Sequence, residues 1–141
     1  MHEIDYMSEK LYPRIGVGVI IKKEGRILMG LRKGSHGKGT WSFPGGHLEF
    51  NETFESCARR EVKEETGLAV RETNFVTATN DIMAADGKHY VTIFIEALVD
   101  DGEPSVCEPD CCERWEWFYP DKMPNDLFLP IINLIKSGYN F

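Results

Sequence analysis

The chain has 141 residues, 42% hydrophobic and 28% charged, which is typical of a globular domain with one core, so we predict a single domain spanning residues 1–141. The net charge of −7 argues against a protein that coats DNA or an anionic membrane, and we expect neither a nucleic acid polymer nor a membrane as partner. A nucleotide substrate is compatible with this charge, because a bound divalent cation can supply positive charge locally.

Two features of the sequence bear on its location. No segment reaches the apolar length of a membrane span. The N-terminal segment MHEIDYMSEKLYPR is polar and acidic, without the basic and apolar regions of a signal peptide. We therefore expect a cytoplasmic protein.

The first elements predict a β-hairpin followed by a loop. The β-branched, apolar run RIGVGVIIK at 14–22 predicts a central strand, and ILMGLR at 27–32 predicts its partner. Between them, KEGR supplies a turn around Gly25. The segment KGSHGKGT at 33–40 predicts a flexible, glycine-rich loop.

The next element is a helix. Asn51 or Thr53 can cap its N-terminus, and Gly67 lies where a helix commonly ends in the left-handed conformation. We expect Glu52 and Glu55 in its first turn, where the helix dipole favours negative charge.

The remainder of the chain predicts further strands and a closing helix. Strands are expected at 75–83, 89–99 and 114–119. An amphipathic helix is expected within 125–139, where Pro130 must fall in the first turn or kink the helix. Strands on both sides of a helix, with a second helix at the end, predict a mixed α/β fold in layers.

Four cysteines occur in the chain, Cys57, Cys107, Cys111 and Cys112. The segment CEPDCC invites a zinc interpretation, but it lacks the paired CxxC knuckles of a structural zinc site. Adjacent cysteines would also point in opposite directions on an extended backbone. We favour free, reduced thiols, with a metal site or a disulfide as the alternative.

Three glutamates crowd the C-terminal half of the first helix. Glu61, Glu64 and Glu65 fall on one face, near the helix end where the dipole disfavours negative charge. Like charges at this spacing cost roughly a few tenths of a kcal/mol per exposed pair. A Mg²⁺ ion, or Mn²⁺ as a substitute, would remove the repulsion, because three carboxylates form a half-shell that water and phosphates complete. Taken alone, the triplet is also explained as a solvated acidic face beside basic residues.

The residues around the triplet favour the metal site. In GGHLEFNETFESCARREVKEETGL, Gly46 is followed after five residues by Glu52, and after seven more by REVKEETGL, which begins at Arg60. This pattern resembles the Nudix box, the signature of the Nudix hydrolase family, at every specified position. The resemblance implies an α/β/α sandwich around a mixed sheet. It also implies that the box forms a loop–helix–loop that holds catalytic metal ions against a diphosphate.

The resemblance assigns a role to each acid of the box. Glu61 and Glu65 would be the main ligands of Mg²⁺, and Glu64 would be a ligand or the base that prepares the attacking water. Arg60 would orient the acid-bearing helix, held by a salt bridge to Glu52. Relatives in the family also suggest a homodimer.

Segments outside the helix extend the resemblance to the substrate. LRKGSHGKGTWSFPGGHLEFNET, HYVTIF and EPDCCERWEW are similar to mammalian family members that act on dGTP-type and thiopurine nucleotides. By this similarity, Gly46 would let the backbone approach the metal ion or phosphate. The implied substrate-binding residues are Gly45, Gly46, His47, Arg32 and Lys33 at the phosphates, and Thr92, Phe128 and Leu129 at the base.

Several of these assignments have alternatives. His47, Arg32 and Lys33 are also explained as solvated surface residues. The chain departs from these relatives at Ser42 and at Leu129–Pro130, which leaves the preferred base open. Two further sets of residues remain undecided. Trp115 and Trp117 are more often core or cavity wall than platforms on which a base stacks. An acid from a loop beyond the box could assist it, and the candidates are Glu108, Asp110 and Glu113.

We predict a Mg²⁺-dependent pyrophosphohydrolase that cleaves a (deoxy)nucleoside triphosphate to the monophosphate and pyrophosphate. Its role would be to remove oxidised or non-standard nucleotides, or to balance nucleotide pools. One alternative is cleavage of ADP-ribose or a dinucleoside polyphosphate. Such family members tend to carry a proline or tyrosine about 16 to 18 residues after the box, where this chain reads MAADG. A second alternative is a non-catalytic nucleotide-binding module, but such modules usually lack some of the box acids.

Overall fold

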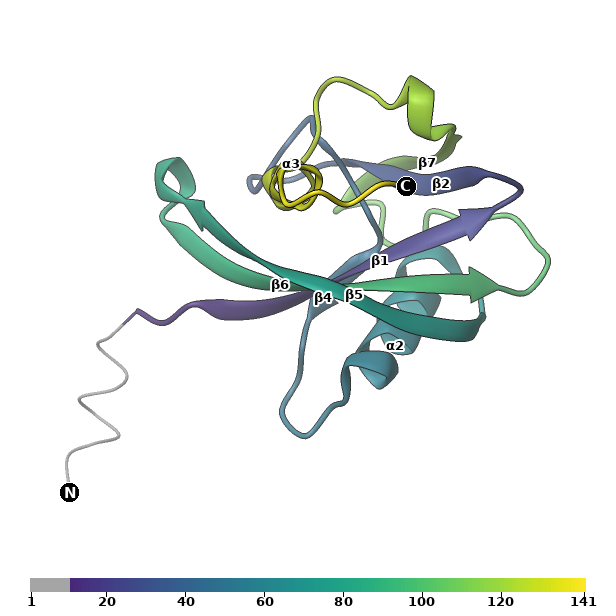
Figure 1. The fold of residues 1–141 in the computed structure, drawn as a ribbon, viewed down its shortest axis with the longest axis horizontal. Helices are drawn as coiled ribbons and strands as arrows, with labels where there is room; N and C mark the ends of the chain where they lie inside the picture. The colour runs from purple at the N-terminus through teal and green to yellow at the C-terminus, as the bar shows by residue number, and fades with distance from the viewer. Residues whose placement is uncertain (1–10) are drawn as a thin grey trace.

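A computed structural model describes residues 11–141 of the chain (Figure 1). The prediction that the chain lacks a signal peptide rests mainly on residues 1–10, which lie outside the described part. The start of the predicted domain lies outside it too. Among the described residues, none of the helices has the length and hydropathy needed to cross a membrane.

The described chain forms a mixed sheet with two α-helices. The elements are β1 (Arg14–Lys23), β2 (Arg26–Arg32), β3 (Trp41–Ser42), β4 (Gly45–His47), α2 (Phe54–Thr66), β5 (Val70–Met83), β6 (Lys88–Val99), β7 (Cys112–Phe118) and α3 (Leu129–Lys136), with 3₁₀ turns at Ala84–Asp86 and Pro120–Lys122. The strand order is β3-β2-β1-β6-β5, with β4 also paired to β1 and β7 to β2. β1 and β6 run parallel, and the other pairs are antiparallel. The predicted position of β1 inside the sheet is confirmed.

The two α-helices lie on opposite sides of this sheet, which confirms the predicted α/β/α sandwich (Figure 1). Alternate residues of β1 supply the two hydrophobic cores, as the period of two along a strand requires. Val17, Val19 and Ile21 pack in the core that contains Cys57, Ala58 and Val62 of α2. On the other face, Ile20 packs in the core that contains Ile131 and Leu134 of α3.

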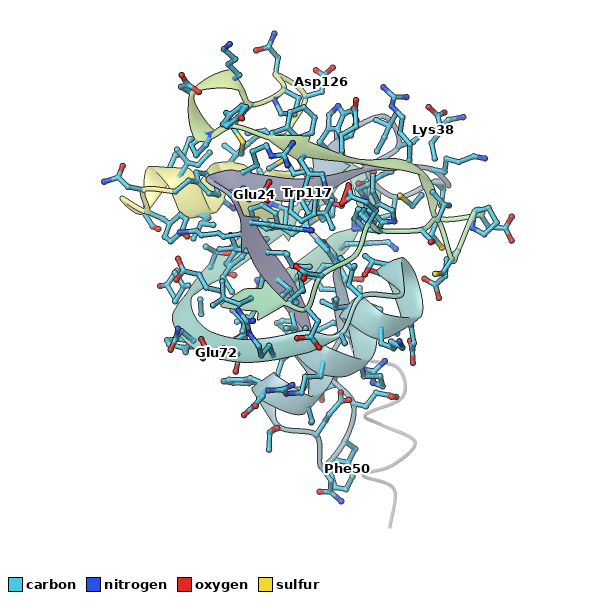
Figure 2. The ribbon with its side chains drawn as sticks, turned by 90° about the vertical axis from the view of Figure 1, so that its right-hand side faces the viewer. Glu24, Lys38, Phe50, Glu72, Trp117 and Asp126 are labelled. Atoms are coloured by element: carbon cyan, nitrogen blue, oxygen red, sulfur yellow. The ribbon has the colours of Figure 1, made fainter. Side chains whose placement is uncertain are left out.

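The predicted hairpin is confirmed, with its turn at Glu24 and Gly25. Both residues have positive φ, 52° and 76°, as a tight two-residue turn between strands of right-handed twist favours. Trp117 of β7 lies beside this hairpin. Lys23 Nζ and Arg26 Cζ are each 5.9 Å from the centre of its indole ring. Figure 2 shows this residue in the body of the molecule. This agrees with a packing role for Trp117.

The sequence prediction differs from the structure in the bounds of β5 and α3 and in two short strands, and β7 begins at Cys112 rather than at residue 114. β5 begins at Val70 rather than at residue 75, because its polar first residues pair with the end of β6. The closing helix begins only at Leu129, with Pro130 in its first turn. The segment before it is extended, and Phe128 N donates to Trp41 O at 2.9 Å. Strands β3 and β4 were not predicted, because each is only two or three residues long.

Candidate active site

The acid-bearing helix α2 is fixed at both ends by its own sequence. Thr53 is the N-cap: its hydroxyl accepts from Ser56 N, and its N–H donates to Ser56 Oγ, each at 3.0 Å. Gly67, with φ 77°, ends the helix in the left-handed conformation, as predicted. Glu55 lies in the first turn, but Glu52 precedes the cap, so its predicted place in that turn is wrong.

Glu52 instead reaches across to Arg60, which confirms the predicted ion pair. Arg60 Nε lies 2.6 Å from Glu52 Oε2, and Arg60 Nη2 lies 3.0 Å from Oε1. The guanidinium lowers the pKa of Glu52 to about 2, and the same hydrogen bonds raise the pKa of Arg60. Arg60 also donates to His47 O at 3.1 Å and to the carboxylate of Glu61. Its Nη1 also lies 3.4 Å from Glu64 Oε2, so one arginine ties together the helix, the loop before it and two acids of the triplet.

The three acids of the triplet differ in their surroundings. Burial raises the pKa of Glu65 to about 8, although the Gly45 N–H donates to its Oε1 at 2.8 Å. Burial also raises the pKa of Glu61, against the contact with Arg60. Glu64 is the most open, with 49% of its side chain exposed. Two of the three carboxylates are therefore partly buried, and the third is open to solvent on the same helix.

The two glycines of β4 allow it to lie close to its neighbours, Gly45 to β1 and Gly46 to α2. A Cβ on Gly46 would lie 2.3 Å from Glu61 Oε2, and a Cβ on Gly45 would lie 1.9 Å from Val17 O. A side chain at residue 45 would collide with the backbone of β1, whereas one at residue 46 would displace the carboxylate of Glu61. The carboxylate of Glu61 occupies the space that a side chain at residue 46 would need.

The donor set fits a hard divalent cation. Within residues 11–141, no three His, Cys, Asp or Glu side chains are already gathered as a metal shell, because Glu61 turns to Arg60 and Glu65 to Gly45. The acids nevertheless repel one another: the charges of Glu61 and Glu108 raise the pKa of Glu65, and those of Glu64 and Glu108 raise the pKa of Glu61. A cation would relieve this repulsion, and carboxylate oxygens are the ligands that Mg²⁺ and Mn²⁺ accept.

A cavity of about 440 Å³ adjoins Glu65. Most of the predicted substrate-binding residues line it: Gly45, Gly46, His47, Arg32, Lys33, Thr92 and Phe128. Leu129 is not part of the lining, contrary to the prediction, since α3 presents Pro130 and Ile131 there instead. The other box residues, Glu52, Arg60, Glu61 and Glu64, lie outside the lining, behind Gly46 and Glu65.

Aromatic and basic side chains form one wall of the cavity. Arg32 lies 4.0 Å above the ring of Phe128 and donates to His36 O at 3.1 Å, and burial lowers its pKa. His47 stacks on Tyr90 with ring centres 5.5 Å apart, and its Nε2 lies 3.0 Å from Tyr90 Oη. His36 and Tyr90 were missed by the sequence prediction, because neither belongs to the box. His36 lies in the glycine-rich loop after β2 and Tyr90 in β6, where the local structure alone is enough to explain each residue.

The loop between β6 and β7 brings two of the three candidate acids to the cavity. Glu108 and Asp110 line it, whereas Glu113 pairs with Arg114 at 2.6 Å and is not part of the lining. Trp115 is one of the lining residues, so it is cavity wall. All four cysteines have free thiols.

Comparisons with known proteins agree with this geometry. The NUDIX domain model matches residues 12–135. The oxidized purine nucleoside triphosphate hydrolase of Danio rerio is 31% identical over 106 residues, which are 75% of this chain and 66% of that protein. Phosphatase NudJ of Escherichia coli is 29% identical over 92% of this chain and 87% of its own length. The crystal structure of the MutT NUDIX hydrolase of Burkholderia pseudomallei has a TM-score of 0.82 at 36% identity, covering 89% of this chain and 98% of that one.

Two archaeal relatives share only part of their length with this chain. The chain spans 61% of the low-salt glycan biosynthesis protein Agl8 of Haloferax volcanii, at 34% identity over 63% of this chain. It spans 34% of the ADP-ribose pyrophosphatase of Methanocaldococcus jannaschii, at 47% identity over 41% of this chain.

Proposed function

The chain belongs to the Nudix hydrolase family, as its sequence predicts, and we propose that it cleaves (deoxy)nucleoside triphosphates to the monophosphate and pyrophosphate with a bound Mg²⁺ ion. The observation that carries the proposal is the hydrogen bond of 2.8 Å from Gly45 N to Glu65 Oε1. It joins the acid-bearing helix to the glycine pair at the wall of a cavity large enough for a nucleoside.

The acids of α2 have different roles at the diphosphate: two bind the cation and one accepts a proton from water. Glu61 and Glu65 would hold the cation, together with the main chain at Gly46. A bound Mg²⁺ would offset phosphate charge and lower the pKa of a water molecule. Glu64, exposed at the end of the helix, takes the proton of the attacking water. Arg60 keeps Glu61 in place by binding it and Glu52 together.

The reaction breaks one anhydride bond. The P–O bond that bridges the α- and β-phosphorus breaks as the oxygen of water bonds to one of the two. Attack at the α-phosphorus expels pyrophosphate with the electron pair, and attack at the β-phosphorus expels the nucleoside monophosphate with it. Arg32, Lys33 and His47 supply donors near the phosphates from the cavity wall. Phe128 and Thr92, which also line the cavity, would contact the base.

The identity of the triphosphate is the finer part of the proposal. The likeness to the Danio rerio hydrolase supports oxidised or non-standard purine nucleotides and a role in cleaning the nucleotide pool. A second candidate, cleavage of ADP-ribose, is favoured by the 47% identity over 58 residues with an archaeal ADP-ribose pyrophosphatase. We also propose a cytoplasmic location and a homodimer; light scattering on the purified chain tests the dimer.

One substrate panel separates these candidates. The protein is assayed with Mg²⁺ against normal and oxidised nucleoside triphosphates, ADP-ribose and dinucleoside polyphosphates, and the products are identified by chromatography. We expect the highest kcat/KM for a nucleoside triphosphate. A higher value for ADP-ribose would replace the proposed substrate, and no hydrolysis of any compound would favour a non-catalytic module.

A matched pair of variants links the activity to the site. Glu64→Gln should abolish turnover, whereas Glu55→Gln, on the first turn of the same helix, should not. Equal effects of the two substitutions would separate the activity from the acid triplet.

A further inference from the structure

A fully buried carboxylate, Asp81, lies near the end of β5. Its Oδ2 accepts hydrogen bonds from the hydroxyls of Thr79, at 3.0 Å, and Thr92, and its Oδ1 accepts from Asn133 Nδ2 at 2.9 Å. All three donors are uncharged. Burial of a carboxylate among neutral donors is costly, so its presence calls for an explanation beyond packing.

Of the three donors, only Thr92 also lines the cavity. It pairs with Gly16 across the parallel strands β1 and β6. A Cβ on Gly16 would lie 3.9 Å from Thr92 Oγ1, so the glycine leaves the side of the hydroxyl towards β1 uncovered. Met83, Phe94 and Ile131 supply apolar surface to the same cavity. The Thr92 hydroxyl is therefore a polar group available to a ligand that enters the cavity.

The contact with Asp81 sets the polarity of that hydroxyl. A threonine hydroxyl has one hydrogen to donate and two lone pairs to accept with. Because its hydrogen is directed to Asp81, Thr92 Oγ1 can only accept from a group in the cavity. Asn133 of α3 holds the other oxygen of Asp81, which keeps the carboxylate from turning away.

We propose that Asp81 is a specificity-determining positioning residue, which fixes Thr92 as an acceptor and so selects nucleobases that present an N–H donor to it. The inference rests on the proposed function, because it takes the cavity to bind the base of a nucleotide. A base with an acceptor at the same place would set two lone pairs against each other in a buried site. A single buried hydrogen bond left unmade corresponds to a loss of about tenfold in affinity.

Binding of nucleoside monophosphates tests the inference without hydrolysis. Calorimetry compares AMP with 6-methoxypurine riboside monophosphate, GMP with 1-methyl-GMP, and CMP with its 4-methoxy analogue. In each pair, the second member lacks donors that the first has: both N–H of the exocyclic amino group for AMP and CMP, and N1–H for GMP. We expect the wild-type protein to prefer the donor-bearing member at least tenfold in the pair that binds most tightly.

Three variants assign the preference. Thr92→Val, which keeps the shape but lacks the oxygen, should remove the preference by weakening the donor-bearing member. Asp81→Ala frees the hydroxyl to donate, so it should raise the affinity of the methoxy analogues, which a purely structural role would not do. Thr79→Val is the matched control: it removes another hydroxyl from the same oxygen of Asp81 but lies outside the cavity lining, and should leave the preference unchanged.

The outcomes distinguish this inference from the proposed reaction. Equal affinities within every pair, binding of none of the compounds, or an unchanged preference in Thr92→Val would overturn the inference. If Asp81→Ala does not fold, Thr92→Val and Thr79→Val still decide it. Discrimination without hydrolysis of any triphosphate would support the inference and refute the proposed reaction.

Discussion

Replacement of Gly46 by alanine should disable the site while leaving the fold nearly intact. The added Cβ would lie 2.3 Å from Glu61 Oε2 and 2.4 Å from its Cδ, whereas ordinary contacts begin near 3.4 Å. The carboxylate of Glu61 must therefore retreat by about 1 Å. A displacement of this size in a catalytic group costs on the order of 100-fold in rate. Because residue 46 does not have a left-handed φ, alanine introduces no backbone strain there.

The assay is steady-state kinetics on the preferred triphosphate, with thermal unfolding measured in parallel. Gly46→Ala should lower kcat by about 100-fold. Gly16→Ala is the comparison, because its Cβ would meet no atom closer than 3.8 Å, and any effect there should appear in KM rather than in kcat. A Gly46→Ala protein with the wild-type kcat would refute the argument that Glu61 must stay against residue 46.

Three further predictions address the acids, the base and the dependence of stability on pH. Glu64→Gln and Glu65→Gln should each lower kcat by orders of magnitude without changing the melting temperature by more than a few degrees, and near-normal turnover in both would remove these residues from the chemistry. Phe128→Ala should change the ranking of nucleotides in the substrate panel, and an unchanged ranking would exclude this ring from base recognition. Burial opposes ionisation of Glu96, but hydrogen bonds from Tyr139 and Lys22 outweigh it and lower the pKa of this carboxyl. Its ionised form therefore stabilises the fold at pH values above the usual carboxyl range. This contribution is lost as the pH falls through the lowered pKa. Urea unfolding should thus show Glu96→Gln to be less stable by about 1 kcal/mol or less at pH 7, with the difference shrinking as the pH falls below the usual carboxyl range; a difference that grows with acidity would contradict this sign.

The acid triplet could be predicted from the sequence because its spacing within one helix determines its geometry. Glu61, Glu64 and Glu65 share a face in any α-helix, and the repulsion between them is evident before the fold is known. The ion pair between Glu52 and Arg60 was also predictable, but only through resemblance to the box, since Glu52 lies outside the helix.

The cavity floor could not be predicted in the same way. In the sequence, Asp81 is one polar residue at the end of a strand, and nothing local indicates that it is fully buried. Its surroundings come from Thr92, on the adjacent strand, and from Asn133, 52 residues later in the chain. Leu129 was misplaced for a related reason, because the face of α3 that meets the cavity is set by where the helix begins, and its first residue was not predicted.

The central claim is tested most directly by the products formed from one nucleoside triphosphate, with and without Mg²⁺. We expect one monophosphate and one pyrophosphate for each triphosphate consumed, no reaction after chelation of the metal ion, and turnover lowered by orders of magnitude in Glu65→Gln with Mg²⁺ present. Release of orthophosphate and a nucleoside diphosphate, or hydrolysis that survives both chelation and the loss of Glu65, would contradict it.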